Sequence, residues 1–140
     1  MKKKFGKEQK KMLKMWRIFA ICFNLVFATT DYECPSAIPT LSAVKRCPGN
    51  RTEWIQASNQ KKCSFIKQNC SSESDFQYHC LLNQKADGFV EVCLPVRLIV
   101  GHFCPFYDSE KARVDNHYTI PCQDHKVNCP QHYRSNEAYK

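Results

Sequence analysis

The sequence is poor in glycine, with only four glycines scattered through 140 residues. Glycine-rich loops cradle phosphates with their backbone N–H groups and need several glycines close together. The sequence also lacks a G-x-S-x-G segment, which would place a serine nucleophile on a sharp turn. These absences argue against nucleotide-binding enzymes and against hydrolases of the α/β type.

Metal-binding spacings are missing as well. Zinc sites usually contain cysteines two to four residues apart, whereas 6 to 17 residues separate successive cysteines beyond the first thirty residues. The nearest approaches to a ligand pair are His79 beside Cys80 and His102 near Cys104. The segment ADGFVE, residues 86–91, has too few acids for a calcium loop. We expect no metal, no cofactor and no catalytic residue.

The histidines and carboxylates of the chain do not lie in any recognisable catalytic motif. A nucleophilic mechanism needs a serine or free thiolate beside a base. Isolated histidines usually lie at the surface or on the face of a strand and have no catalytic role. Asp108, Glu110 and Asp115 lie close together in a polar segment, so a carboxylate pair stays open as an alternative. The histidines are His79, His102, His117, His125 and His132.

No apolar run is long enough to span a membrane. The run IFAICFNLVFA, residues 18–28, has eleven residues, whereas a bilayer needs about 20. A basic segment, residues 1–17, precedes it, and small residues follow. This order is typical of a secretory signal peptide, which we expect over residues 1–30. Retention of residues 18–30 as a membrane anchor is the alternative; otherwise we expect no membrane span in the mature chain.

Positive charge is concentrated in this leader. Residues 1–17 carry eight of the 21 Lys and Arg residues and one of the 13 acidic residues, a net of +7. Residues 31–140 carry the other 13 basic and 12 acidic residues, a net of +1. A nearly neutral body lacks the basic face that nucleic acids require and the basic amphipathic character of host-defence peptides. We therefore expect no nucleic-acid partner.

The body is rich in cysteine, with nine in residues 31–140. This density is typical of an oxidising compartment, where disulfides persist and each adds about 2–4 kcal/mol to stability. One of the nine must stay unpaired within the chain. We favour a partner beyond the end of the chain, with an intermolecular disulfide and a free thiol as alternatives. The expected disulfide cysteines, whose pairing stays open, are Cys34, Cys47, Cys63, Cys70, Cys80, Cys93, Cys104, Cys122 and Cys129.

The clearest structural pattern is a β-hairpin. Apolar side chains alternate over residues 76–82, and residues 89–93 are rich in β-branched and aromatic side chains. Between them, residues 83–88 predict a loop in which Gly88 supplies the positive φ of a reversal. Pro95 ends the second strand because it removes a backbone donor.

Other elements are predicted around this hairpin. Asn50 and Glu53 resemble a capping box and predict a helix over residues 50–63, anchored by Trp54. One or two helical turns are expected between Cys34 and Cys47, with Pro39 near their start and Ile38, Leu41 and Val44 on one face. Residues 97–100 predict a third strand that Gly101 ends, and residues 107–118 predict a short helix or a long loop. These elements predict a small disulfide-rich α+β domain with short N-terminal helices packed on a small antiparallel sheet.

Two sequons and four tyrosines are candidate surface features. Asn50 and Asn69 begin N-x-S/T sequons, although a helix cap competes with a glycan at Asn50 and oxidation of Cys70 competes with transfer to Asn69. Tyrosine combines apolar area with a polar tip, so exposed tyrosines are candidate contact residues, with ordinary surface or core roles as the alternative. They are Tyr107, Tyr118, Tyr133 and Tyr139.

Several short segments together resemble a known arrangement: ECP at 33–35, RCPGNRTEWIQAS at 46–58, YHC at 78–80, FVEVCLP at 89–95, IVGHFCPFY at 99–107 and CPQHYRSNEAYK at 129–140. They resemble an uncharacterised cysteine-rich extracellular module of bivalve mollusc proteins that are secreted or have a single membrane span. The resemblance implies a domain over residues 31–140 that is truncated before a further cysteine. It implies no activity and no functional residues.

These features predict a secreted or receptor-ectodomain-like, disulfide-stapled recognition module without catalytic activity. Its partner is expected to be an extracellular protein or glycan. A secreted hydrolase or an enzyme inhibitor is the alternative. A deep pocket with converging histidine and carboxylate groups would favour the enzyme, and one rigid exposed loop would favour the inhibitor.

Overall fold

The computed structural model describes residues 33–121 and 129–138. It divides the chain into two compact units, residues 1–31 and 32–140. The signal peptide expected over residues 1–30 lies outside the described residues. Within the described ranges, no helix is both long and apolar enough to cross a membrane.

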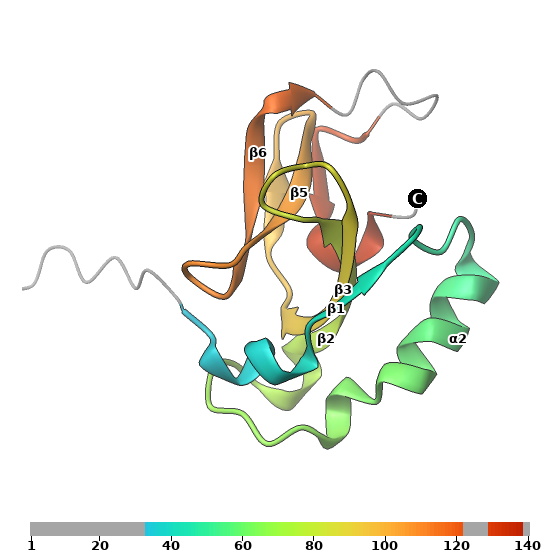
Figure 1. Ribbon diagram of the computed structural model, residues 1–140, viewed down its shortest axis with the longest axis vertical. Helices are drawn as coiled ribbons and strands as arrows, with labels where there is room; N and C mark the ends of the chain where they lie inside the picture. The colour runs from blue at the N-terminus through green and yellow to red at the C-terminus, as the bar shows by residue number, and fades with distance from the viewer. Residues whose placement is uncertain (1–32, 122–128, 139–140) are drawn as a thin grey trace, which may run out of the picture. The chain divides into compact units, whose positions relative to one another are not determined.

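The second unit is built around a five-stranded sheet with the order β1-β3-β2-β5-β6 (Figure 1). A second sheet contains β4 and β7. All strand pairs are antiparallel except for one parallel bridge between β2 and β5. The expected small disulfide-rich α+β domain is therefore confirmed. In chain order the elements are η1 Pro35–Thr40, β1 Ser42–Val44, α2 Arg51–Lys61, η2 Cys63–Phe65, η3 Glu73–Asp75, β2 Phe76–Leu82, β3 Phe89–Pro95, β4 Leu98–Val100, β5 Phe103–Asp108, β6 Arg113–Pro121, β7 His132–Arg134 and η5 Ser135–Glu137.

The predicted hairpin is confirmed as β2 and β3, which pair over their full length. The left-handed residue of its loop, however, is Ala86 with φ 56°, and not Gly88 as expected. The side chain of Asn83 explains the difference. Its amide donates to Asp87 Oδ1 at 2.7 Å and its oxygen accepts the Asp87 N–H at 3.2 Å. These local bonds hold the reversal one residue before the Asp-Gly pair.

Both faces of the hairpin are covered, so its strands are apolar on both sides. Tyr78 and Cys93 are register partners and lie on the face where Tyr78 meets Trp54 of α2, with ring centroids 4.8 Å apart. His79 points to the opposite face, where it contacts Ser135 of η5. Strands that are buried on both faces have nearly continuous apolar sequences.

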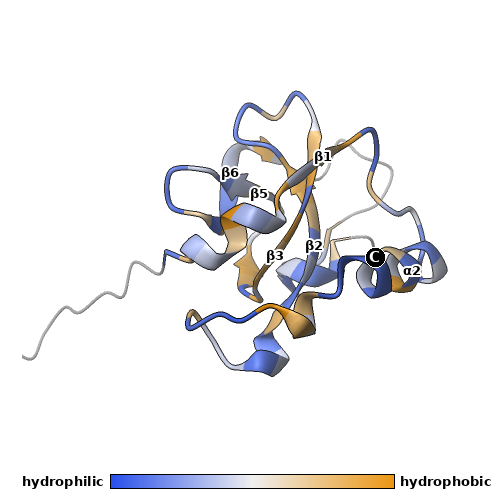
Figure 2. Cartoon of the chain, turned by 60° about the horizontal axis from the view of Figure 1, so that its bottom comes forward, coloured by the Kyte–Doolittle hydropathy of each residue, from blue (hydrophilic) through white to orange (hydrophobic). Residues whose placement is uncertain are grey.

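Helix α2 begins and ends close to the predicted positions. Asn50 is its N-cap, and the Asn50 Oδ1 accepts the Glu53 N–H at 2.9 Å. The helix ends at Lys62, which has φ 54° and forms a left-handed C-cap. Most of α2 is hydrophilic, in contrast to the largely hydrophobic β3 (Figure 2). Trp54 is the buried anchor, as predicted.

The N-terminal turns differ from the prediction. Residues 35–40 form a 3₁₀ helix that begins at Pro35, so Pro39 lies inside it and not near its start. Ile38 and Leu41 are exposed, and Val44 belongs to β1. Ala37 is the buried residue of this turn. The spacing of three apolar residues therefore does not mark a core-facing helix.

Residues 107–118, predicted as a short helix or a long loop, are instead part of the β5–β6 hairpin. Their polar composition reflects the position of β6 at the edge of the sheet. Asp108 Oδ1 accepts the N–H groups of Glu110 and Lys111 at the turn. Ala112 then takes a positive φ of 47°. A strand with one solvated face usually alternates apolar and polar residues, but in β6 the positions that alternate with the buried Val114 include the polar Asn116 and the exposed Tyr118, so no clear pattern results.

The predicted third strand is confirmed as β4, which ends before Gly101. Gly101 has φ 82°, a left-handed conformation that suits glycine. Strand β4 pairs with β7 and not with the β2–β3 hairpin. Ile99 and Tyr133 are register partners in this second sheet, and both are buried.

Disulfides staple segments that lie far apart in the sequence, as expected from the cysteine content. Cys104 is also disulfide-bonded. Cys129 is free. The three described pairs are Cys34–Cys70, Cys47–Cys80 and Cys63–Cys93.

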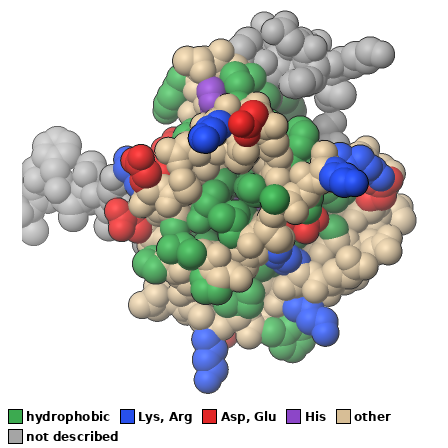
Figure 3. Space-filling model, viewed as in Figure 1, with side chains coloured by type: hydrophobic (Ala, Val, Ile, Leu, Met, Phe, Trp, Pro, Cys, Tyr) green, Lys and Arg blue, Asp and Glu red, His purple; other side chains and the backbone are tan. Residues whose placement is uncertain are grey.

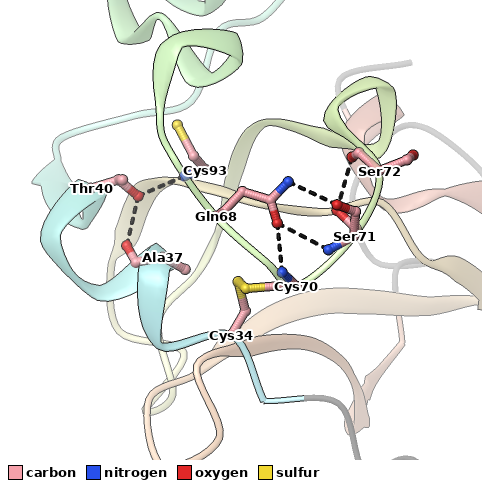
Figure 4. Close-up of a disulfide and its surroundings, with 8 residues drawn as sticks. All are labelled: Cys34, Ala37, Thr40, Gln68, Cys70, Ser71, Ser72 and Cys93. Carbon is pink, nitrogen blue, oxygen red and sulfur yellow. Dashed lines mark hydrogen bonds between the residues drawn. A yellow bond between two sulfur atoms is a disulfide. The ribbon is translucent and has the colours of Figure 1, made fainter.

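Figure 4 shows how the segment around the Cys34–Cys70 disulfide is ordered. Gln68 Oε1 accepts the N–H groups of Cys70 at 2.7 Å and Ser71 at 2.9 Å. Thr40 Oγ1 donates to the Ala37 carbonyl at 2.6 Å and accepts the Cys93 N–H at 2.8 Å. Side chains therefore satisfy backbone groups where the chain leaves regular structure.

Candidate functional site

The main cavity of the described region is a half-open pocket of about 600 Å³. Its walls come from the segment before α2, from α2 itself, from the ends of β2 and β3, from β5 and β6, and from residues 129–138. Cavities of about 300–1,000 Å³ are the usual size of small-molecule sites. The principal wall residues are Trp54, Leu82, Phe89, Pro105, Cys129 and Tyr133.

The pocket wall is mostly apolar. It combines aromatic rings and prolines with the Cys47–Cys80 disulfide, whose two cysteines both line the cavity. Glu137 is the charged residue among the described lining residues, and His132 is an exposed neighbour at the same wall. Such a pocket suits a ligand with little charge, because buried charges need partners.

Polar groups at the back of the pocket are engaged with one another. The Tyr133 hydroxyl donates to the Phe103 carbonyl at 2.6 Å. It also lies within hydrogen-bonding reach of the Cys129 thiol. Burial raises the pKa of Cys129, and the hydrogen bond with Tyr133 opposes that shift only in part. The thiol is therefore protonated at neutral pH and is a poor nucleophile.

A serine–histidine pair that resembles a catalytic dyad lies elsewhere, between β2 and η5. His79 Nδ1 is 2.9 Å from the Gln77 carbonyl and Nε2 is 2.8 Å from Ser135 Oγ. The carbonyl fixes the tautomer, so Nδ1 donates and Nε2 accepts the Ser135 hydroxyl. The same oxygen accepts the Arg97 N–H at 2.9 Å. His79 and Ser135 are both completely buried, so neither side chain is exposed to solvent.

The carboxylates that were left open as an acid–base pair have structural partners. Asp108 accepts backbone N–H groups in the β5–β6 turn. Asp115 lies 2.7 Å from Arg113, and its pKa is lowered by the Asn116 N–H and the Arg113 guanidinium against an opposing effect of burial. Glu110 is exposed in the turn. None of the three lines the apolar pocket.

The remaining histidines do not converge. His102 Nδ1 is 2.8 Å from the Cys129 carbonyl, and His117 packs edge-on against Phe106. His132 lines the pocket, and His125 lies outside the described residues. Across residues 33–121 and 129–138, no group of three or more His, Cys, Asp or Glu side chains is placed to hold a metal ion.

The four candidate contact tyrosines separate into different environments. Tyr107 and Tyr133 are buried, which corrects their interpretation as exposed contacts. Tyr118 is 70 % exposed and packs edge-on against Phe103. Tyr139 lies outside the described residues. Sequence reasoning thus named Tyr133 but missed its place in a pocket wall, because strand β7 gives no periodic signal over three residues.

Both sequons lie at the surface. Asn50 Oδ1 caps α2, whereas its Nδ2, the atom that would carry a glycan, donates to Glu53 Oε1 at 3.2 Å. The two uses of Asn50 therefore concern different atoms. Asn69 is exposed, next to the buried and oxidised Cys70. Glycosylation at both positions stays a prediction.

A second, smaller cavity of about 380 Å³ lies beside the Cys34–Cys70 disulfide. Arg97 and Arg113 line it together with Asp75. Arg97 donates to the Val114 carbonyl at 3.3 Å and Arg113 pairs with Asp115. These guanidinium groups are engaged with the protein, so the larger pocket is the stronger candidate site.

Exposed apolar side chains are distributed over several elements. Figure 3 shows hydrophobic side chains in the middle of one face, with charged groups around them. Single exposed apolar residues are normal on soluble proteins, so they do not define a site by themselves. The large hydrophobic residues with exposed side chains are Ile38, Leu41, Ile55, Phe65, Phe89, Leu98, Val100 and Tyr118.

Comparison with known proteins gives no relative from which a function can be transferred. No protein-family model, curated protein or solved structure matches this chain.

Proposed function

We propose that this chain is an extracellular, disulfide-stapled recognition module that binds its ligand in the apolar pocket and catalyses no reaction on it. A small domain with three described disulfides is compatible with an extracellular module. The resemblance to cysteine-rich extracellular proteins points in the same direction. The observation that carries the proposal is the pocket of about 600 Å³.

The walls of this pocket favour binding because they are preorganised. The Cys47–Cys80 disulfide forms part of the wall, and Trp54 is held against Tyr78 by an edge-on ring contact. A site that is already ordered loses little conformational entropy when a ligand binds. Sugar hydroxyls would need several hydrogen-bonding partners, and the mostly apolar wall favours other ligands over a glycan.

A hydrolase is the alternative function, and the His79–Ser135 pair is the feature that favours it. Its geometry fits a general base beside a nucleophile. Both side chains are completely buried, and Ser135 Oγ already accepts the Arg97 N–H. Catalysis would require opening of the fold around η5, so we favour a structural role for the pair.

Secretion and reactivity together test this proposal. The chain is produced in secretory eukaryotic cells with its own residues 1–30, and protein from the medium is treated with a fluorophosphonate. A secreted serine hydrolase in the same medium shows that the reagent is active. We expect the protein in the medium and no adduct on Ser135. Retention of the protein inside the cells, or an adduct on Ser135, would overturn the proposal.

A further inference from the structure

We infer that the apolar pocket binds an uncharged, largely apolar small molecule. This inference rests on the proposed function only in taking the pocket as the ligand site. It is carried by the composition, charge and size of the cavity between α2, the β2–β3 hairpin and residues 129–138.

The size of the cavity exceeds that of a single side chain. At about 600 Å³ it falls in the middle of the range for small-molecule sites. Trp54 and Phe89 supply aromatic surface, and Leu82 and Pro105 supply aliphatic surface. Transfer of apolar ligand surface from water to such walls contributes most of the binding energy.

The charge of the wall argues against ions. No lysine or arginine is found among the described lining residues, and Glu137 contributes a carboxylate. An anionic ligand would therefore meet no lysine or arginine among the described lining residues and would lie near the Glu137 carboxylate. A cationic ligand would compete with the interaction that Glu137 already makes within the protein. Both kinds of charge lose hydration that the wall does not replace.

The polar groups in the pocket wall do not need a polar ligand as a hydrogen-bonding partner. The Tyr133 hydroxyl already donates to the Phe103 carbonyl. The Cys129 thiol is free of disulfide bonding and lies against this tyrosine. A protonated thiol is only a weak hydrogen-bond donor and behaves largely as an apolar group.

Two fluorescent probes with one scaffold test this inference. N-phenyl-1-naphthylamine is uncharged, and 8-anilinonaphthalene-1-sulfonate is the same ring system with a sulfonate. Each is titrated into the disulfide-bonded full-length protein, and fluorescence gives the dissociation constant. We expect saturable binding of the neutral probe at one site. We expect the anionic probe to bind about tenfold more weakly or worse, because its sulfonate meets a carboxylate and, among the described lining residues, no lysine or arginine.

Matched variants locate the site. Phe89→Ala removes an aromatic wall, and Phe65→Ala makes the same change at a residue that is 82 % exposed and outside the pocket. We expect Phe89→Ala to weaken the neutral probe about tenfold, in line with the loss of apolar surface that the ligand would cover, and Phe65→Ala to leave binding unchanged. Ala138→Trp adds a large side chain at a residue that lines the cavity and should also weaken binding. Unlike Phe89→Ala, it removes no side chain from the pocket wall. Cooperative thermal unfolding checks that each variant is folded.

The results separate this inference from the proposed function. Equal or tighter binding of the sulfonate, or equal effects of Phe89→Ala and Phe65→Ala, would overturn the ligand class or its location. A secreted protein that binds neither probe would overturn the inference and leave the proposed function standing. A protein that stays in the cytosol but binds the neutral probe in the pocket would overturn the proposed extracellular function and support the inference about the ligand.

Discussion

At the residue scale, the most informative pair is His79 and Ser135. In an accessible cleft this geometry would indicate nucleophilic catalysis. Here both side chains are completely buried, the pair joins β2 to η5, and the Arg97 N–H uses the same hydroxyl oxygen. The hydroxyl thus partners both the buried Nε2 of His79 and the part-buried Arg97 N–H.

Removal of this hydroxyl should cost stability. We expect Ser135→Ala to lower the free energy of unfolding by about 2–4 kcal/mol, because the imidazole and the Arg97 N–H both lose a buried partner. Ser72→Ala is the matched control, since Ser72 is exposed and bonds only to neighbouring side chains. It should change stability by less than about 0.5 kcal/mol. Chemical denaturation with intact disulfides measures both, and equal effects would contradict a structural role for Ser135.

The same histidine should make stability depend on pH. Burial lowers the pKa of His79 to about 4, against a small opposing effect of the Gln77 carbonyl. The unfolded chain, with an ordinary histidine pKa near 6.5, binds more protons between these values. Stability is therefore complete above about pH 6.5 and is lost as the pH falls towards 4.

Unfolding free energies between pH 7.5 and pH 5 measure this effect. We expect a loss of about 2 kcal/mol from His79 over this interval. His79→Gln, which cannot titrate, should show a flatter profile than the natural chain, whatever its absolute stability. A profile of the natural chain that does not change over this interval, or that matches the variant, would show that His79 is not kept neutral by the fold.

At the scale of elements, the Asn50 cap fixes where helix α2 begins. We expect Asn50→Ala to lower the unfolding free energy by about 1 kcal/mol, because the Glu53 N–H loses its acceptor. Asn50→Asp retains an acceptor oxygen and should be nearly neutral. Both variants destroy the same sequon, so thermal or chemical unfolding of the two separates the cap from any glycan. Equal losses would assign the effect to the glycan.

The junction between β4 and β5 depends on a left-handed glycine. A Cβ at Gly101 would lie 2.9 Å from the Phe103 ring, on a backbone with φ 82°. We expect Gly101→Ala to destabilise the protein by about 1–2 kcal/mol. Gly49→Ala is the matched control, because a Cβ there meets nothing within 4 Å. If both substitutions prove neutral in denaturation, the left-handed turn is not required for the fold.

Local patterns in the sequence were sufficient for some elements and misleading for others. The hairpin and α2 could be predicted because alternation and the Asn50–Glu53 spacing act within a few residues. Strand β6 could not, because Asn116 and the exposed Tyr118 interrupt the alternation that begins at the buried Val114. The positive φ at Ala86 escaped prediction because the Asn83–Asp87 side-chain bond, rather than glycine, decides the turn.

At the scale of the whole molecule, the pocket is a product of long-range assembly. Its wall joins residues as far apart as Cys47 and Ala138. No local pattern indicates which of these side chains meet, since 105 pairings of eight cysteines are compatible with the sequence. The Cys47–Cys80 disulfide brings the segment before α2 to the end of β2 and so creates one side of the cavity. The cysteine content predicted that disulfides would join distant segments. The location of the pocket could be found only from the three-dimensional structure.

The disulfide map of secreted protein is the decisive measurement for an extracellular module with this pocket. Protein from the medium, alkylated before digestion and analysed without reduction, gives the pairing by peptide mass spectrometry. We expect Cys34–Cys70, Cys47–Cys80 and Cys63–Cys93, with Cys129 joined to none of these six. Recovery of the protein inside cells with all of these cysteines alkylated, or a map in which Cys47 pairs elsewhere, would contradict an extracellular module with this pocket.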